Sequence, residues 1–151
     1  MKIFFSLLLL KLLLLADNTL IYQTLVVTKQ HEGFSKYLYM DNGNYSIGYG
    51  TNLSGGISKD EAELLLRYRL NKTYKKLIKY DWYSCLNTPR KIAVLDLAYN
   101  LGITKLLRFR HFIWRLKHSY YKAAANALRE SAWYHQVGSR ALYIVNIIEK
   151  G

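Results

Sequence analysis

The sequence is short of cysteine and proline, and each shortage excludes a kind of protein. Cys85 is the only cysteine, which excludes a disulfide within the chain. If the protein works outside the cytoplasm, it must fold stably without that cross-link. We expect Cys85 to be a packed, unreactive thiol, because nothing near it in the sequence suggests a base that would activate it. The single proline excludes a proline-rich linker between domains.

Acidic residues are also scarce, and their scarcity leaves a strongly basic protein. Ten Asp and Glu stand against 22 Lys and Arg, for a formal net charge of +12. Such a charge attracts polyanions, among which nucleic acid, anionic lipid and the bacterial wall all qualify. No run of five basic residues occurs, which argues against a nucleic-acid-binding tail. A basic surface with no particular partner is the alternative.

The first residues have the form of a targeting segment. Residues 1–16 begin with Met1 and Lys2 and continue as a leucine-rich run that Lys11 interrupts. This pattern predicts a secretory signal, because a stable membrane-spanning helix needs about 20 apolar residues. An uncleaved signal anchor and an apolar first helix of the domain are alternatives. We place a junction at residues 17–19 and the folded domain at 20–151.

A helix followed by a small sheet is predicted for the start of this domain. Apolar residues at helical spacing over 20–30 predict a helix that stops at Gly33. The pair Asn42-Gly43 lies between aromatic and branched residues and predicts a tight hairpin. We therefore expect a β-hairpin or three-stranded sheet from about residue 37 to 52.

The rest of the chain has helical patterns. A capping box at Ser58–Glu61 opens a long helix that is expected to reach about Lys79. Another helix is expected to begin with Thr88 as cap and Pro89 and to end at Gly102, and further helices over 105–117, 120–132 and 139–150. The fold class is thus α+β, with the strands segregated from the helices. The long helix should bury an apolar stripe of Ala62, Leu65, Leu66, Tyr68, Leu70, Leu77 and Ile78. We expect Trp114 and Trp133 to lie in the core and not to contact a ligand.

Two acids lie at the junction between the first helix and the hairpin. Glu32 and Asp41 are nine residues apart, one at a helix end and the other on a strand. Because a helix–turn–strand folds the chain back on itself, the two carboxyls can face each other across a cleft. Glycoside hydrolysis uses such a pair: one acid protonates the leaving oxygen, and the other activates water or attacks the sugar. Two solvated surface acids are the alternative.

Three blocks of sequence surround these acids: HEGF at 31–34, YMD at 39–41 and YSIGYG at 45–50. Together they resemble the active-site signature of the phage-type lysozymes and endolysins, glycoside hydrolase family 24, which includes the T-even phage lysozyme. In that family a Glu, eight residues, an Asp and a short hairpin precede Thr-Ile-Gly-x-Gly. The resemblance covers roughly residues 20–151 and extends to blocks at 57–63, 97–102, 123–126, 131–136 and 139–141.

The resemblance implies a lysozyme-like α+β fold, with a small sheet lobe joined by a long helix to a helical lobe. It also implies a muramidase that cuts the β-1,4 bond between N-acetylmuramic acid and N-acetylglucosamine. Glu32 would be the general acid, and Asp41 would activate the hydrolytic water or stabilise charge at the sugar. Ser46 stands where the family usually has Thr and would position that water. The hairpin is one residue shorter than usual.

Further positions follow from the same resemblance. Asn52, Tyr99, Asn100 and Asn126 match cleft positions that contact sugar, and Arg140 matches an arginine that pairs with the catalytic Glu. No cofactor and no metal are expected. The expected partner is bacterial peptidoglycan and not nucleic acid, with a monomer exported to the periplasm or cell wall, or secreted. A transient membrane association through residues 1–16 is allowed. The alternative function is a cationic protein that disrupts membranes or walls without catalysis.

Overall fold

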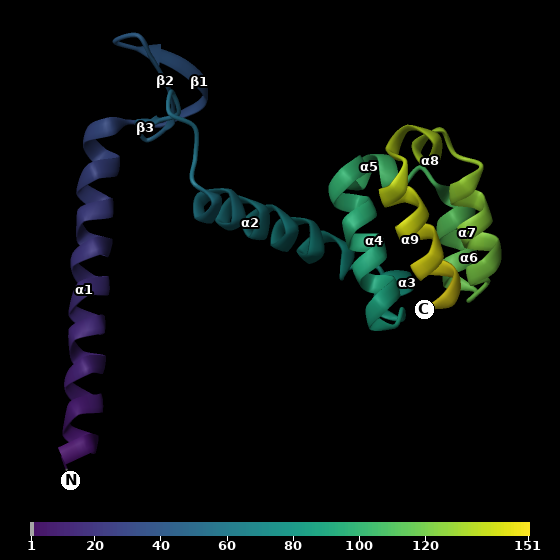
Figure 1. The fold of residues 1–151 in the computed structure, drawn as a ribbon, viewed down its shortest axis with the longest axis horizontal. Helices are drawn as coiled ribbons and strands as arrows, with labels where there is room; N and C mark the ends of the chain where they lie inside the picture. The colour runs from purple at the N-terminus through teal and green to yellow at the C-terminus, as the bar shows by residue number, and fades with distance from the viewer. Residues whose placement is uncertain (1) are drawn as a thin grey trace. The chain divides into compact units, whose positions relative to one another are not determined.

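A computed structural model describes the backbone of residues 2–151 and the side chains of Leu15 and of residues 17–151. The chain divides into two compact units, one ending at Ser58 and the other spanning Lys59–Gly151. The first holds one helix and the sheet, and the second holds helices (Figure 1). The predicted α+β class, with strands segregated from helices, is therefore confirmed.

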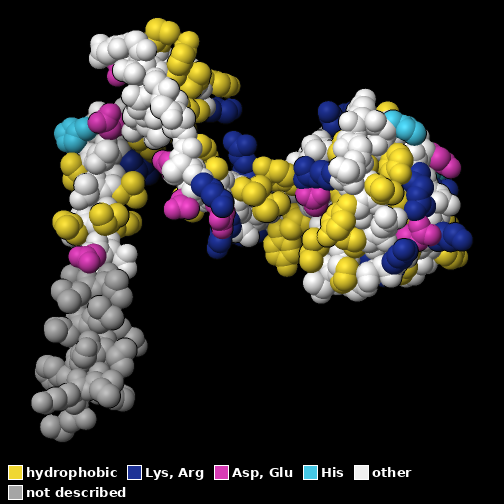
Figure 2. Space-filling model, viewed as in Figure 1, with side chains coloured by type: hydrophobic (Ala, Val, Ile, Leu, Met, Phe, Trp, Pro, Cys, Tyr) yellow, Lys and Arg dark blue, Asp and Glu magenta, His cyan; other side chains and the backbone are white. Residues whose placement is uncertain are grey.

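The first unit consists of α1 (Lys2–Glu32), β1 (Ser35–Asp41), β2 (Asn44–Gly48) and β3 (Thr51–Asn52). The helix predicted over 20–30 is the last part of α1, and Gly33 ends it with a φ of 65°. The backbone of residues 2–16 continues the same helix, but the side chains of residues 1–14 and 16, on which the predicted export signal rests, lie outside the described residues. In its described part α1 exposes apolar side chains, among them Leu20, Ile21 and Val27 (Figure 2).

The three strands form an antiparallel sheet in the order β1-β2-β3. Asn42 and Gly43 have φ angles of 49° and 80°. Positive values at both central positions are what a two-residue hairpin turn requires, and Asn-Gly adopts them at low cost. The predicted hairpin is confirmed, and the turn fixes its register, with Asp41 opposite Asn44.

The second unit packs its helices around one apolar core. Its elements are α2 (Lys59–Leu77), α3 (Asp81–Ser84), α4 (Thr88–Leu101), α5 (Ile103–Leu106), α6 (Arg110–Lys117), α7 (Tyr121–Arg129), α8 (Ala132–Val137) and α9 (Ser139–Lys150). Helices α4, α6, α7 and α9 meet at Leu97, Phe112, Leu128 and Ile144, which are fully or almost fully buried. Gly102 ends α4, as predicted, with a φ of 81°.

Arg90 fastens α4 to the end of α9. Its Nε donates to the Ile148 carbonyl at 2.9 Å, and one terminal nitrogen donates to the Glu149 carbonyl at 3.2 Å. These carbonyls belong to the last turn of α9, where no helical amide follows to bond them. The guanidinium also lies 3.6 Å from the centre of the Tyr121 ring. A buried cation is thus satisfied by a helix terminus and an aromatic face.

Four local predictions for this unit are wrong. Only Leu77 of the expected α2 stripe is buried, because α2 packs on α4 and α5 and not on a partner along its whole length. Asn87, not Thr88, caps α4: its side chain accepts from the Arg90 amide. Cys85 is exposed, since the neighbouring Tyr83 and Leu86 take the inward positions. Trp114 is 54% exposed instead of buried, whereas Trp133 is buried as expected.

Candidate active site

Glu32 is the last residue of α1, and its side chain reaches the turn between β2 and β3. The side chain is exposed, and its Oε2 would lie only 2.9 Å from a Cβ added at Gly50. Gly50 also has a positive φ of 77°, which favours glycine. The glycine at position 50 therefore serves two needs at once: it forms the turn and it leaves room for the carboxylate.

Three other predicted residues share one face of the sheet. Directly opposed residues on antiparallel strands project from the same side, as do residues two apart on one strand. Asp41 is two residues from Tyr39, Tyr39 pairs with Ser46, and Ser46 pairs with Asn52. Ser46 is buried, at 5% exposure, whereas Asp41 is exposed. The sheet thus groups an accessible carboxylate with a sheltered hydroxyl.

Hydrogen bonds within the loop after β3 hold Asn52 in place. The Asn52 Oδ1 accepts from the Ser54 amide at 2.8 Å, and the Ser54 hydroxyl accepts from the Tyr45 amide, also at 2.8 Å. The Asn52 side chain is therefore tied to β2 as well as to its own loop. Its amide nitrogen keeps its two donor hydrogens, the kind of group that recognises a sugar hydroxyl.

A small aromatic contact flanks the turn that holds Glu32, and sequence reasoning did not single it out. The Tyr49 ring lies 5.3 Å from Phe34, centre to centre, and the Lys29 Nζ lies 5.2 Å from the Tyr49 ring centre. These contacts tie the end of α1 to the β2–β3 turn. Lys29 precedes Glu32 by three residues, a spacing that places two side chains on the same side of a helix. The three-residue spacing between Lys29 and Glu32 is the sequence feature from which Lys29 could have been predicted to lie near the site.

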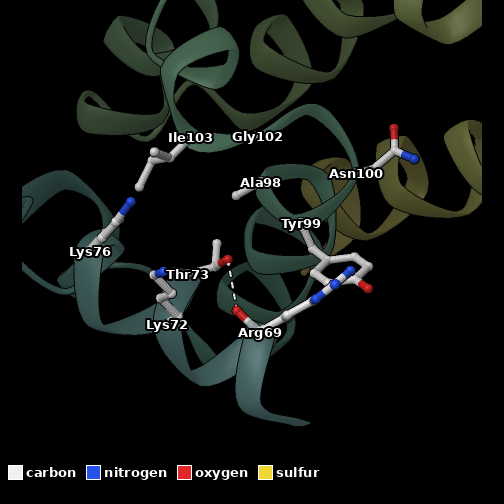
Figure 3. Close-up of a pocket in the computed structure, with 9 residues that line it drawn as sticks. All are labelled: Arg69, Lys72, Thr73, Lys76, Ala98, Tyr99, Asn100, Gly102 and Ile103. Carbon is white, nitrogen blue, oxygen red and sulfur yellow. Dashed lines mark hydrogen bonds between the residues drawn. The ribbon is translucent and has the colours of Figure 1, made fainter. Parts of the chain in front are cut away.

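In the second unit, Tyr99 and Asn100 line a single cleft near the end of α4 (Figure 3). The Asn100 Oδ1 accepts from the Trp133 indole nitrogen at 2.8 Å, which fixes the orientation of this amide. The volume of the cleft is about 470 Å³, within the range of ligand-binding pockets. Its full lining is Arg69, Lys72, Thr73, Lys76, Ala98, Tyr99, Asn100, Gly102 and Ile103.

Asn126 and Arg140 are not among the residues that line this cleft. The Asn126 Oδ1 accepts from Arg129 at 2.7 Å. Arg140 forms a two-pronged ion pair with Asp96, in which Nε lies 2.9 Å from Oδ2. The hydrogen bonds that Arg140 donates to the Asp96 carboxylate raise the pKa of Arg140. Asp96 is thus a partner that sequence reasoning missed, and the pairing of Arg140 with Glu32 stays a prediction.

The described residues contain no group of three or more His, Cys, Asp and Glu side chains that could hold a metal ion. The first unit contributes two carboxylates and a hydroxyl. The second unit contributes an aromatic ring, an amide and several cations around a cleft.

Comparison with known proteins places both units in one family. The sequence model of the phage lysozyme family matches residues 29–146. Probable T4-type lysozyme 1 of Dictyostelium discoideum is 26% identical over 99 residues, covering 63% of this chain and 58% of the relative. Probable T4-type lysozyme 2 of the same organism is 23% identical over 155 residues, covering 82% of this chain and 91% of the relative. The chain spans less than two thirds of the first of these relatives.

The family match includes both candidate carboxylates and most of the helical unit, which agrees with the resemblance found in the signature blocks. It supports a lysozyme-type function. The chain belongs to the phage lysozyme family.

Proposed function

We propose that the protein is a muramidase that hydrolyses the β-1,4 bond between N-acetylmuramic acid and N-acetylglucosamine in bacterial peptidoglycan. The observation that supports this most is the position of Glu32. Its carboxylate lies against Gly50, in a turn where any other residue would push it away. A family of lysozymes whose match begins just before Glu32 supplies the reaction class.

In this proposal the two carboxyls have different tasks. Glu32 donates its proton to the oxygen that links the two sugars, and the bond from that oxygen to the muramic acid carbon breaks. Asp41, exposed and at the end of β1, stabilises the positive charge on the sugar ring or takes a proton from the attacking water. The Ser46 hydroxyl, on the same face of the sheet, orients that water. The water oxygen ends on the sugar carbon, and the proton that this water loses returns to Glu32, either directly or, where Asp41 has accepted it, through solvent.

We also propose that the protein acts outside the cytoplasm as a monomer, with residues 1–16 serving as the export segment. The leucine-rich run and the lysines at positions 2 and 11 motivate this. Because α1 is continuous from Lys2 to Glu32, cleavage after Ala16 would leave a 17–32 segment of helix ahead of the hairpin. No helix among the described residues has both the length and the apolar character that crossing a membrane demands.

Replacement of Glu32 by Gln tests the proposal directly. The amide keeps the size of the side chain but cannot donate a catalytic proton. We expect the release of reducing sugar ends from purified peptidoglycan to fall by roughly 10²–10⁴-fold, the usual contribution of a general acid. Mass analysis of the products should show fragments that end in muramic acid. Asp41→Asn should also lower the release of reducing sugar ends in the same assay.

Glu130→Gln is the matched control, because it makes the same isosteric substitution at an exposed position of the second unit. It should retain wild-type turnover. If Glu32→Gln released sugar ends at the wild-type rate, the assignment would be wrong. If that variant also killed cells at the wild-type rate, and heat-denatured protein still permeabilised them, the basic protein would act by disrupting membranes instead.

A further inference from the structure

Three cations line the cleft of the second unit along one side. Arg69, Lys72 and Lys76 come from α2 and are spaced three and four residues apart, so they share one face of the helix. Figure 3 shows the Arg69 side chain extending toward Tyr99 and the Lys76 side chain extending toward Ile103. The cleft is therefore positive along the wall that α2 provides.

Nothing acidic among the described residues neutralises this wall through an ion pair. The ion pairs of these residues join Arg67, Arg129 and Arg140 to acids, and none involves a cation of the cleft. The segment from 67 to 79 contains no Asp or Glu, but six basic residues: Arg67, Arg69, Lys72, Lys75, Lys76 and Lys79. Like charges held together at about one helical turn repel one another, and an anionic ligand would relieve that repulsion.

The opposite wall offers groups of a different kind. Tyr99 and Asn100 come from α4, and the contact with Trp133 fixes the Asn100 amide. An aromatic ring and an oriented amide are groups that contact sugars, and the resemblance to family members predicts that role for both. Figure 3 shows the Arg69 side chain beside the Tyr99 ring and the Asn100 side chain turned away from the cations. A sugar that contacts the Tyr99 ring would bring its charged substituents toward the cations of α2.

In peptidoglycan the charged substituents are peptides attached to muramic acid, and their free ends are carboxylates. We propose that the cations Arg69, Lys72 and Lys76 bind the carboxylates of these peptides while Tyr99 and Asn100 contact the glycan. The inference rests on the proposed function for its choice of ligand, and it assigns to α2 a part in substrate recognition. Arg presents a planar fork to a carboxylate, and the two Lys act as point charges.

The test uses soluble glycan fragments that carry their peptides, with the carboxylates either free or converted to amides. Binding is measured by titration calorimetry with the full-length Glu32→Gln protein, which should not cleave the fragment. We expect the free-carboxylate fragment to bind about tenfold more tightly than the amidated one. The triple substitution Arg69→Gln, Lys72→Gln and Lys76→Gln should remove this preference, since Gln preserves helix propensity but carries no charge.

The matched control is Lys59→Gln, Lys75→Gln and Lys79→Gln, which removes the same charge from exposed positions that do not line the cleft. It should keep the preference. Equal binding of the two fragments to the Glu32→Gln protein would overturn the inference, as would an equal loss of preference in the two triple variants. A preference for a phosphodiester polymer over the carboxylate fragment, lost only in the cleft variant, would overturn it in favour of teichoic acid.

The failure of this inference is separable from failure of the proposed function. Wild-type release of sugar ends without any carboxylate preference in binding overturns the role of α2 and leaves the muramidase proposal standing. Carboxylate-dependent binding without any release of sugar ends overturns the muramidase proposal alone.

Discussion

The two units differ in what their buried side chains are made of. Among the residues whose side chains are described, every buried apolar one lies between Leu77 and Ile148, in the second unit. In the first unit the buried described residue is Ser46, a polar one. Burial of apolar area is the main source of folding free energy. The second unit therefore contains the apolar core that supplies most of the folding free energy of the described residues. The first unit carries the candidate acids, on a hairpin and at a helix end.

This contrast explains why a glycine governs the placement of Glu32. The Glu32 side chain is exposed, and backbone turns and short contacts within the first unit place it. Gly33 ends α1, Gly50 admits the Glu32 carboxylate, and Tyr49 bridges to Phe34 and Lys29. In the second unit the candidate sugar contacts Tyr99 and Asn100 instead stand on α4, whose other side is in the core.

Shortening a core side chain should show the largest difference between the units. Leu97→Ala removes a fully buried side chain where α4 faces the core, so it should lower the free energy of unfolding by about 2–5 kcal/mol. Leu38→Ala, at a position 54% exposed on β1, should change it by less than about 0.5 kcal/mol. Urea unfolding measures both. Equal losses for the two variants would show that the hairpin packs against a partner.

The second largest effect is a dependence of folding stability on pH, and it comes from a buried tyrosine, Tyr83. Burial, with a smaller contribution from nearby Tyr74, raises the pKa of Tyr83 to about 12 from 10.0. Between these values the unfolded chain has lost the proton that the folded one keeps, so stability falls as pH rises. Stability from Tyr83 is complete below pH 10 and should decrease by about 2–3 kcal/mol on reaching pH 12.

Tyr83→Phe should flatten this alkaline decrease, at a cost near neutral pH of about 1 kcal/mol for the lost hydrogen bond to the Lys91 carbonyl. Tyr37→Phe in the first unit is the control: Tyr37 is 72% exposed, so it should leave the alkaline decrease unchanged. Thermal unfolding followed from pH 8 to 12 makes the measurement. An alkaline decrease that survives Tyr83→Phe in full would contradict the assignment.

The same contrast decides what could be predicted from the sequence. The hairpin at Asn42-Gly43 and the stop at Gly102 are local, because each depends on the φ angles that its own residues prefer, and both are confirmed. The exposure of Trp114 and of Cys85 depends on which helices pack beside them, and the sequence nearby does not contain that information. The Asp96–Arg140 pair joins residues 44 apart in the chain, so spacing did not indicate it.

The residues of the candidate site also fall into those that local sequence predicts and those that only the packing of helices reveals. The signature blocks located Glu32, Asp41 and Ser46, and the wider resemblance added Asn52. The register of the sheet places Asp41, Ser46 and Asn52 on one face. The cations of the cleft were not singled out, because a basic residue on a helix is ordinarily a solvated one. Only the packing of α2 beside α4 and α5 shows that three basic residues of α2 border a cavity.

The smallest expected effect comes from Gly50→Ala and concerns activity more than stability. The added Cβ would lie 2.9 Å from the Glu32 Oε2, and the flexible carboxylate yields more readily than the backbone. A shift of a few tenths of an ångström suffices, so we expect turnover on peptidoglycan to fall by about tenfold, below the roughly 100-fold that a 1 Å misplacement of a catalytic group can cost. The positive φ adds about 1–2 kcal/mol of strain. Gly56→Ala carries the same strain, with a φ of 79° but nothing within 4 Å of its Cβ, and should keep its turnover. Equal activity of the two variants would mean that the contact between Glu32 and Gly50 plays no part in catalysis.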